Sequence, residues 1–294
     1  MRCRNILFNL MNFLGAVMIT ALALAGLPVQ SVSATGLDLY VATTGSNAGP
    51  NNCQVQASPC LTIVYAVSKV ASNDTIHIAA GTYNENISFH DINLAFIGAG
   101  MDQTILDGGG THGLIYFYGA TVASFTDLTV QNGNNTTDGG GIINNGSTLN
   151  LTRVKVTNNT APNAGGIDSN GTLTVVDSVI SNNTANGVPG VGGGLKVDNA
   201  PSSSISGTTI SGNTAVGSSG GIHIQGASTS LNITNVTISG NTAMYGGAMS
   251  FGGATVSVLN STIADNHFSS GGDIGGVRNF GTIYFKNTLV ANND

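Results

Sequence analysis

The sequence predicts an all-β fold, a right-handed parallel β-helix of about nine coils behind a short N-terminal capping helix. Three observations lead to this prediction. From residue 139 onward, a Gly-Gly pair followed by an apolar residue recurs every 25 to 29 residues, a period typical of solenoids. Between these pairs, apolar and polar residues alternate as they do in strands. Asn and Gly recur too often for helices to persist, and parallel crossover connections are nearly always right-handed.

Residues 1–34 are predicted to be a signal peptide. Arg2 and Arg4 give a basic start, residues 13–26 form an apolar core, and Val32–Ala34 supplies the small residues that a signal peptidase prefers. An uncleaved signal anchor is the less favoured alternative, because the apolar core is short for a membrane span. We therefore expect a secreted or cell-surface protein with no transmembrane span in its mature part.

Residues 35–73 are predicted to form an N-terminal cap. Cys53 and Cys60 are an even pair in an exported chain, which favours a disulfide that closes a small loop. Half of a metal site is the weaker alternative, because no partner Cys or His lies nearby in the sequence. Residues 59–71 lack Gly, and we expect a short amphipathic helix there to cover the first coil, with these residues at helical spacing: Leu61, Val64, Tyr65 and Ser68.

Residues 74–294 are predicted to form the β-helix, with less regular coils over 74–107. Stretches such as 148–152 (TLNLT) and 172–176 (TLTVV) alternate like strands, and each is followed by a polar turn. Aligning the repeats stacks two turn columns. One contains Asn159, Asn183, Asn213, Asn241, Asn266 and Asn293, and the other Asp127, Asp177, Asn235, Asn260 and Asn287. Asn tolerates left-handed turns and can bond the copies above and below it, so both columns indicate scaffold rather than an active site.

The C-terminal stretch 289–294 (LVANND) stops in the middle of a coil. A bare apolar rung would invite edge-to-edge aggregation. We therefore expect the β-helix to be truncated at its C-terminus.

The composition argues against one class of partner. Only 7% of the residues are charged and the net charge is −6. Such a surface cannot neutralise many phosphates, so nucleic-acid binding is not expected.

Two segments resemble known families. The stretch 74–108, with its GTYNE and GAGMDQTILDG turns, resembles the opening coils of the pectin-lyase-like β-helix superfamily. The repeated I-x-x-N-T-A and G-G elements resemble those of polymorphic outer-membrane proteins, which are autotransporter adhesins. Together the resemblances cover roughly residues 74–294. They imply an exported β-helix and two candidate functions, adhesin-like binding or polysaccharide cleavage, although turn chemistry dominates the motifs.

Candidate ligand contacts come from the residues that follow each Gly-Gly pair. Counting outward-facing positions from the pairs places one set of polar and aromatic residues on one face: Asp168, Lys196, Asp198, His223, Gln225, Phe251, Arg278 and Phe280. Phe251 and Phe280 are predicted to contact sugar rings, with Gln225 as a further ligand contact. Lys196 and Arg278 could pair with sugar carboxylates. In 114–119, Tyr116 and Tyr118 share one face and Phe117 points to the other; one of these sets belongs to the core, and the other could be a second sugar platform.

Catalysis is the alternative for the same face. A polysaccharide lyase needs a base and a cation, and the weak candidates are Asp168, Lys196, Asp198, His223 and Arg278. Calcium at Asp168 and Asp198 would be possible only in that case, and no other cofactor or metal is expected. The sequence thus favours a carbohydrate- or surface-binding, adhesin-like module over a lyase or related carbohydrate-active enzyme. A structural stalk of a longer surface protein is the third possibility. Clustering of ionisable groups would distinguish an enzyme from a binding face.

Overall fold

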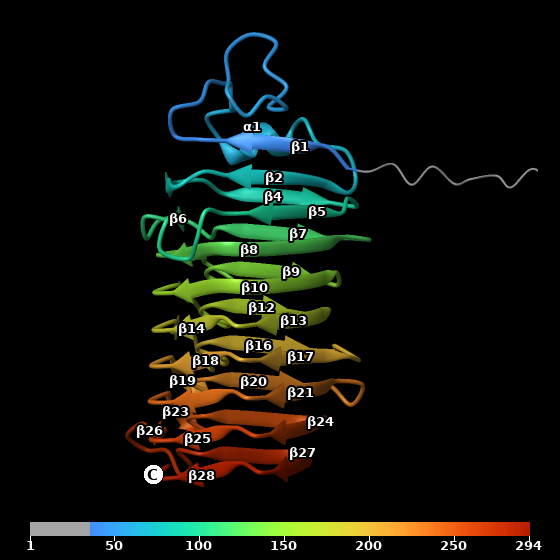
Figure 1. The fold of residues 1–294 in the computed structure, drawn as a ribbon. Coiled ribbons are helices and arrows are strands. Elements are labelled where there is room, and N and C mark those ends of the chain that lie inside the picture. The colour runs from blue at the N-terminus through green and yellow to red at the C-terminus, as the bar shows by residue number, and fades with distance from the viewer. Residues whose placement is uncertain (1–35) are drawn as a thin grey trace, which may run out of the picture. The chain divides into compact units, whose positions relative to one another are not determined.

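The computed structural model describes residues 36–294. The predicted signal peptide lies outside the described residues. The predicted fold class is confirmed, because the described chain is a parallel β-solenoid of about 8 turns with almost no helix. Strands stack as rungs from the N-terminal to the C-terminal end, and α1 (Ile63–Val67) lies at the N-terminal end (Figure 1).

Each turn of the solenoid contributes strands to three faces, and every strand pairs in parallel with its neighbours one turn away. Four long strands run through a corner and serve two faces: β8 (Val122–Gln131), β10 (Thr148–Thr157), β24 (Met249–Leu259) and β27 (Val277–Lys286). The first face contains β1 (Asp38–Val41), β2 (Asp74–Ile78), β5 (Leu94–Ile97), β8 (Val122–Gln131), β10 (Thr148–Thr157), β13 (Thr172–Val176), β17 (Ser203–Ser206), β21 (Ser230–Thr234), β24 (Met249–Leu259) and β27 (Val277–Lys286). The second face contains β3 (Gly81–Tyr83), β6 (Thr104–Asp107), β8, β10, β14 (Val179–Ser181), β18 (Thr209–Ser211), β22 (Thr237–Ser239), β25 (Thr262–Ala264) and β28 (Leu289–Ala291).

The third face carries the candidate site. It contains β4 (Ile87–His90), β7 (Ile115–Tyr118), β9 (Ile142–Asn145), β12 (Ile167–Ser169), β16 (Leu195–Asp198), β20 (Ile222–Gln225) and the first halves of β24 and β27. A small separate sheet fills one corner with β11 (Thr160–Ala161), β15 (Thr184–Ala185), β19 (Thr214–Ser218), β23 (Thr242–Tyr245) and β26 (His267–Phe268).

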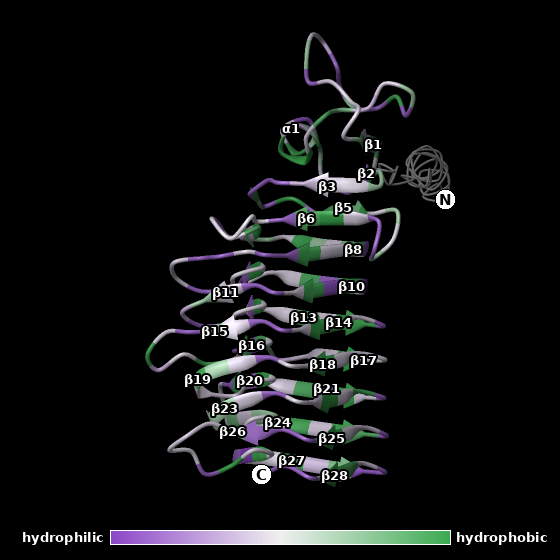
Figure 2. Ribbon diagram, turned by 90° about the vertical axis from the view of Figure 1, so that its left-hand side faces the viewer, coloured by the Kyte–Doolittle hydropathy of each residue, from purple (hydrophilic) through white to green (hydrophobic). Residues whose placement is uncertain are grey.

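Alternation along each strand builds the core. Successive side chains of a strand point to opposite faces, so one set fills the solenoid and the other meets solvent. Figure 2 shows the resulting mixture of apolar and polar residues along the stacked strands. Identical positions stack between turns, as in the rings of Phe96 and Phe125, whose centroids lie 4.7 Å apart.

The column that begins at Asn159 is a buried hydrogen-bonded ladder, as predicted. Asn213 is typical: its Oδ1 accepts from the backbone N–H of Asn183 at 3.0 Å, and its Nδ2 donates to the carbonyl of Ile180 and to Oδ1 of Asn241. The ladder residues within the stack are fully buried. Buried amides are stable there because each has partners in the rungs above and below.

The second predicted column adopts left-handed backbone conformations. Its members have positive φ, for example 57° at Asp127 and 55° at Asn235. Asn and Asp tolerate this region better than most residues, which explains why they recur. The Gly-Gly pairs recur for a different reason, because the neighbouring rung leaves no room for a side chain. A Cβ on Gly166 would lie 2.4 Å from the carbonyl oxygen of Gly194 on the next rung.

The N-terminal cap contains the predicted disulfide and helix. Cys53 and Cys60 are joined, with their Cα atoms 5.1 Å apart. Thr62 caps α1, and the carboxylate of Glu85 accepts hydrogen bonds from the N–H groups of Ile63 and Val64 at 2.9 and 2.8 Å. Ile63 and Ala66 are buried, and Tyr65 packs against the core as a partly buried residue. Leu61, which precedes the helix, and Val64 are exposed.

The two ends of the described stack differ. At the C-terminal end, β27 and β28 have a paired strand on one side only within residues 36–294. Apolar residues of this last rung are exposed, among them Phe285, Leu289 and Val290. Within the same residues, no helix has the length and apolar character needed to cross a bilayer.

Candidate functional site

Outward side chains of the third face form two columns that run along the solenoid. Strand register places Ser88, Tyr116, Ile143, Asp168, Lys196, His223, Ser250 and Arg278 in the first column. The second column contains His90, Tyr118, Asn145, Asn170, Asp198, Gln225, Gly252 and Phe280. The structure thus brings Asp168, Lys196, Asp198, His223 and Gln225 together on three adjoining rungs.

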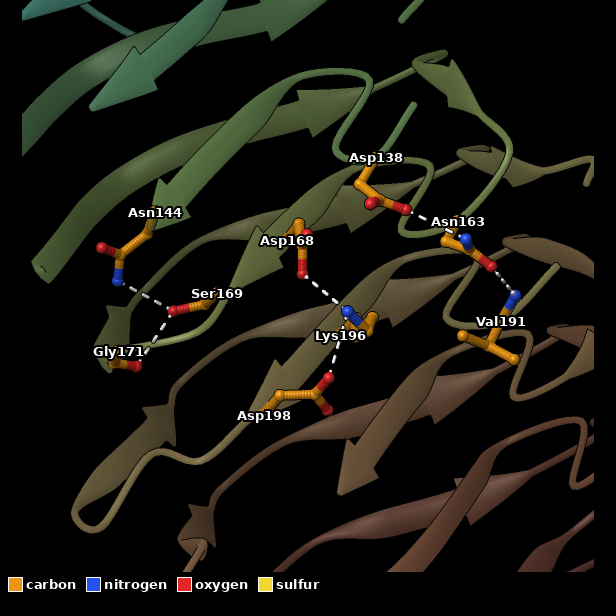
Figure 3. Close-up of polar contacts among 9 residues, drawn as sticks. All are labelled: Asp138, Asn144, Asn163, Asp168, Ser169, Gly171, Val191, Lys196 and Asp198. Atoms are coloured by element: carbon orange, nitrogen blue, oxygen red, sulfur yellow. Dashed lines mark hydrogen bonds and ion pairs between the residues drawn. The ribbon is translucent and has the colours of Figure 1, made fainter. Parts of the chain in front are cut away.

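Lys196 lies between two carboxylates at the centre of this face. Its Nζ is 3.2 Å from Oδ1 of Asp168 and 3.0 Å from Oδ2 of Asp198, as Figure 3 shows. The Lys196 side chain is 16% exposed, against 4% for Asp168 and 15% for Asp198. The ammonium is therefore mostly withdrawn from solvent and held by its own chain.

Burial and charge determine the protonation of this group. Burial is the main cause that raises the pKa of Asp168, and Asp138 and Asp198 add to it, while Lys196 opposes it. Burial alone would lower the pKa of Lys196, but the two carboxylates outweigh it and raise the pKa. Lys196 thus keeps its proton at neutral pH, which makes it a poor general base.

Other polar groups complete the surroundings. Asp138, near Asp168, accepts a hydrogen bond from Nδ2 of Asn163 at 3.0 Å. Oδ1 of Asp198 is the buried side-chain oxygen of the described chain that lacks a hydrogen-bond partner. Asp198 therefore has one acceptor oxygen that no group of the described chain uses.

His223 follows on the next rung. Burial is the main cause that lowers its pKa, and Lys196 contributes, while Asp198 and Gln225 oppose the shift. Its Nδ1 lies 3.3 Å from Oγ of Ser219. His223 is thus uncharged at neutral pH, and of this group it is the side chain suited to accept a proton.

The residues do not fit the calcium site considered for a lyase. Within residues 36–294, no cluster of three or more His, Cys, Asp or Glu side chains could hold a metal ion. The ammonium of Lys196 lies between the carboxylates of Asp168 and Asp198, where a bound cation would have to lie.

Arg278 and Phe280 lie on the last rung of the same face. The guanidinium of Arg278 is 4.5 Å from the ring centroid of Tyr245 and 4.8 Å from that of Phe280. Phe280 is 66% exposed. Tyr245 was missed in the sequence because it ends the corner strand β23 and does not follow a Gly-Gly pair.

Phe251 was predicted to contact ligand, and this prediction is wrong. Phe251 is 1% exposed, and it pairs with the inward residue Ile224. The cause is a register difference of one residue: Gly247 and Ala248 occupy the places of Gly220 and Gly221 in the preceding coil, so Met249 is the first inward strand residue. A shift of one residue moves every side chain of a strand to the opposite side.

An aromatic cluster lies at the other end of the face. Tyr118, 37% exposed, stacks on His90 with ring centroids 4.7 Å apart, and Tyr116 lies 5.4 Å from Tyr118. Tyr116 and Tyr118 indeed share the outward side, whereas Phe117 is buried. His90 was not predicted, because its coil lacks the Gly-Gly marker.

A hollow of about 440 Å³ runs beside this cluster, at the corner between the third and first faces. We call it the corner hollow. Gly119, Gly146 and Gly171 line it, and its polar lining is Thr121, Ser147, Thr148, Asn170, Thr172 and Asn199. It spans four successive coils and borders the second column. The residue that follows each of these strands is Gly or Asn, which is the sequence signal that could have revealed the corner.

No protein-family model and no curated protein matches the chain. Among solved structures, pectate lyase Pel9A is similar, with a TM-score of 0.45 and 15% identity over 86% of this chain and 78% of that chain. The A-modules of the Azotobacter vinelandii mannuronan C-5 epimerases AlgE4 and AlgE6 have TM-scores of 0.28 and 0.30. Their identities are 16% and 13%, over 78% and 74% of this chain and 88% and 90% of theirs. We transfer no residue role from these likenesses.

Proposed function

We propose that this protein binds polysaccharide chains along the third face and the adjoining corner hollow. The observation that carries the proposal is the placement of exposed aromatic rings at both ends of one face, with polar groups between them. Tyr116 and Tyr118 lie at one end, and Phe280 at the other. Aromatic rings offer large apolar contact area with little conformational freedom to lose.

The dimensions favour an extended ligand. Tyr118 and Phe280 are separated by six rung spacings, which corresponds to about 29 Å. A compact ligand could not reach both ends, whereas a polymer lying parallel to the solenoid axis could. The corner hollow extends in the same direction over four coils.

The centre of the face supplies hydrogen bonds. Asn170 and Asn199 line the corner hollow, and Asp198 and Gln225 lie in the neighbouring column. Amide, hydroxyl and carboxylate groups in such a row suit the hydroxyl groups of a sugar chain. We place this binding outside the cytoplasm, where a disulfide such as Cys53–Cys60 persists, in an adhesin-like role.

A double substitution tests the proposal directly. Purified chain would be passed over a panel of immobilised neutral and acidic polysaccharides, and retention compared with that of Tyr118→Ala/Phe280→Ala. We expect the double variant to lose at least about tenfold in affinity, because buried aromatic contacts dominate such interfaces. Phe251 is unsuitable for this test, because its removal would open a core cavity.

Tyr284→Ala is the matched control. Tyr284 is as exposed as Phe280 but belongs to the first-face half of β27. Retention should be unchanged in this variant. Equal retention of both variants, or no retention of wild type by any polysaccharide, would contradict the proposal. A structural stalk would then be the favoured interpretation.

A lyase-like enzyme is the second candidate, favoured by one observation. Four ionisable groups cluster on three adjoining rungs: Asp168, Lys196, Asp198 and His223. His223 rather than Lys196 would then be the base, since Lys196 keeps its proton. Ultraviolet absorbance from new unsaturated uronate ends, measured in the same incubations, tests this candidate. If wild type cleaves a polysaccharide and His223→Gln does not, a lyase function would replace the proposed binding function.

A further inference from the structure

We infer that the third face selects neutral polysaccharides and rejects polyuronates, the acidic chains that Lys196 would otherwise attract. This inference rests on the proposed function and names the ligand class for the same surface. It reverses the expectation drawn from the sequence, in which Lys196 pairs with sugar carboxylates. The reversal follows because the ammonium of Lys196 is already paired with two carboxylates of its own chain.

Lys196 has no free capacity for an external anion. Both carboxylates lie within hydrogen-bond distance of its Nζ, and its side chain is only 16% exposed. A uronate would have to displace Asp168 or Asp198 and leave that carboxylate unpaired in a mostly buried place. Leaving a buried charge uncompensated costs more than the new pair would gain.

The surrounding charge also repels anions. The carboxylates of Asp168 and Asp198 flank the single ammonium of Lys196, and the negative charge of Asp138 adds to the causes that raise the pKa of Asp168. His223 adds no positive charge at neutral pH, because burial lowers its pKa. Like charges brought together at an interface oppose binding and select against the wrong ligand.

The same carboxylates suit sugar hydroxyls. Carboxylate oxygens accept hydrogen bonds from O–H donors, and such bonds are stronger than those between neutral groups. The Asp198 side chain is 15% exposed and its Oδ1 has no hydrogen-bond partner in the described chain, so a sugar hydroxyl that reaches Oδ1 does not have to displace Lys196 from Oδ2. A neutral chain thus supplies the donors that the site lacks and carries no charge to be rejected.

Arg278 is a second basic side chain on this face, and it could attract a polyuronate. It lies three rung spacings from Lys196, about 14 Å, which exceeds the Debye length at physiological salt. Its guanidinium is held between the rings of Tyr245 and Phe280. It could contact only one end of a bound chain, so the centre of the face determines the selection.

Selectivity is measured with immobilised neutral glucan and polygalacturonate at low and high salt. We expect wild type to be retained on the neutral glucan at both salt concentrations and not on polygalacturonate. Asp168→Asn/Asp198→Asn should gain roughly tenfold in affinity for polygalacturonate, because it frees the ammonium for a charge-assisted hydrogen bond. High salt should remove this gain.

Asp265→Asn is the matched control, since it removes one carboxylate at a turn where other coils carry Asn, such as Asn182 and Asn292. Circular dichroism establishes whether the variants are folded. If the double variant is not folded, Asp198→Asn alone replaces it in the selectivity test. Preferential retention of wild type on polygalacturonate, lost in Tyr118→Ala/Phe280→Ala, would overturn the inference and leave the proposed function standing. A folded double variant without gain would also overturn it. Failure of wild type to bind any polysaccharide would overturn both.

Discussion

Burial sets the charge of single side chains on the third face. Lys196 and His223 occupy the same column on adjoining rungs, yet the pKa of the first is raised and that of the second lowered. The difference arises because two carboxylates compensate the burial of Lys196, whereas His223 lacks comparable compensation. The sequence placed both residues on one face, but it could not show that Lys196 is neutralised within its own chain. That property depends on distances set by rung stacking and by the rotamers of Asp168 and Asp198.

The lowered pKa of His223 predicts a loss of stability in mild acid. Below the ordinary value of 6.5, the unfolded chain binds a proton at His223 while the folded chain does not. The contribution of this residue to stability is therefore complete above pH 6.5 and is lost as pH falls through the folded-state pKa. We expect His223→Gln to show a smaller fall in melting temperature than wild type between about pH 8 and about pH 5.

His223→Phe provides a second comparison, because it removes the titrating group and keeps an aromatic ring. Both variants should reduce the acid-induced fall if titration is its cause. A fall in melting temperature that is the same in wild type and both variants would show that other groups determine the acid sensitivity.

At the scale of elements, turns were predicted better than strands. The column from Asn159 to Asn293 and the left-handed turns at Asp127 and Asn235 could be aligned from sequence because turn chemistry is local. The register of the strand after Gly246 could not be aligned from sequence. Gly-Gly-Ala can align with Gly-Gly-Ile in two registers, and only packing of Met249 and Phe251 into the core selects one. Local patterns could not distinguish between them.

The asparagine ladder should contribute strongly to stability. Asn213→Ala would leave the carbonyl of Ile180 and the N–H of Asn183 without their buried partners. Each unsatisfied buried group costs about 1–3 kcal/mol, so we expect a loss of about 3 kcal/mol or more in the free energy of unfolding. Urea unfolding followed by circular dichroism measures it.

Asn232→Ala is the control for the ladder. Asn232 faces outward from β21 and is exposed, so its removal should change stability by less than about 0.5 kcal/mol. If Asn213→Ala were no more destabilising than this control, the ladder would be a consequence of turn geometry and not a source of stability.

At the scale of the whole molecule, the solenoid is close to one-dimensional. Each rung contacts only its neighbours, so stability should vary along the axis and not be shared equally. The N-terminal end is covered by α1 and the disulfide loop. The last rung has its apolar residues exposed, including Phe285 and Leu289. The two ends therefore should not open with equal ease.

Amide hydrogen exchange should show this asymmetry. In a purified chain that ends at residue 294, we expect the weakest protection in β27 and β28, the strongest in central strands such as β13 and β17, and intermediate protection in β1 and β2. Removing the disulfide with Cys53→Ser/Cys60→Ser should lower protection in β1 and β2 by about 2–3 kcal/mol, the contribution expected from closing a short loop. Protection in β13 and β17 should not change, because those strands do not contact the cap. If the substitution instead lowered protection equally in every strand, the stack would be opening as a single cooperative unit, and stability would not be local along the axis.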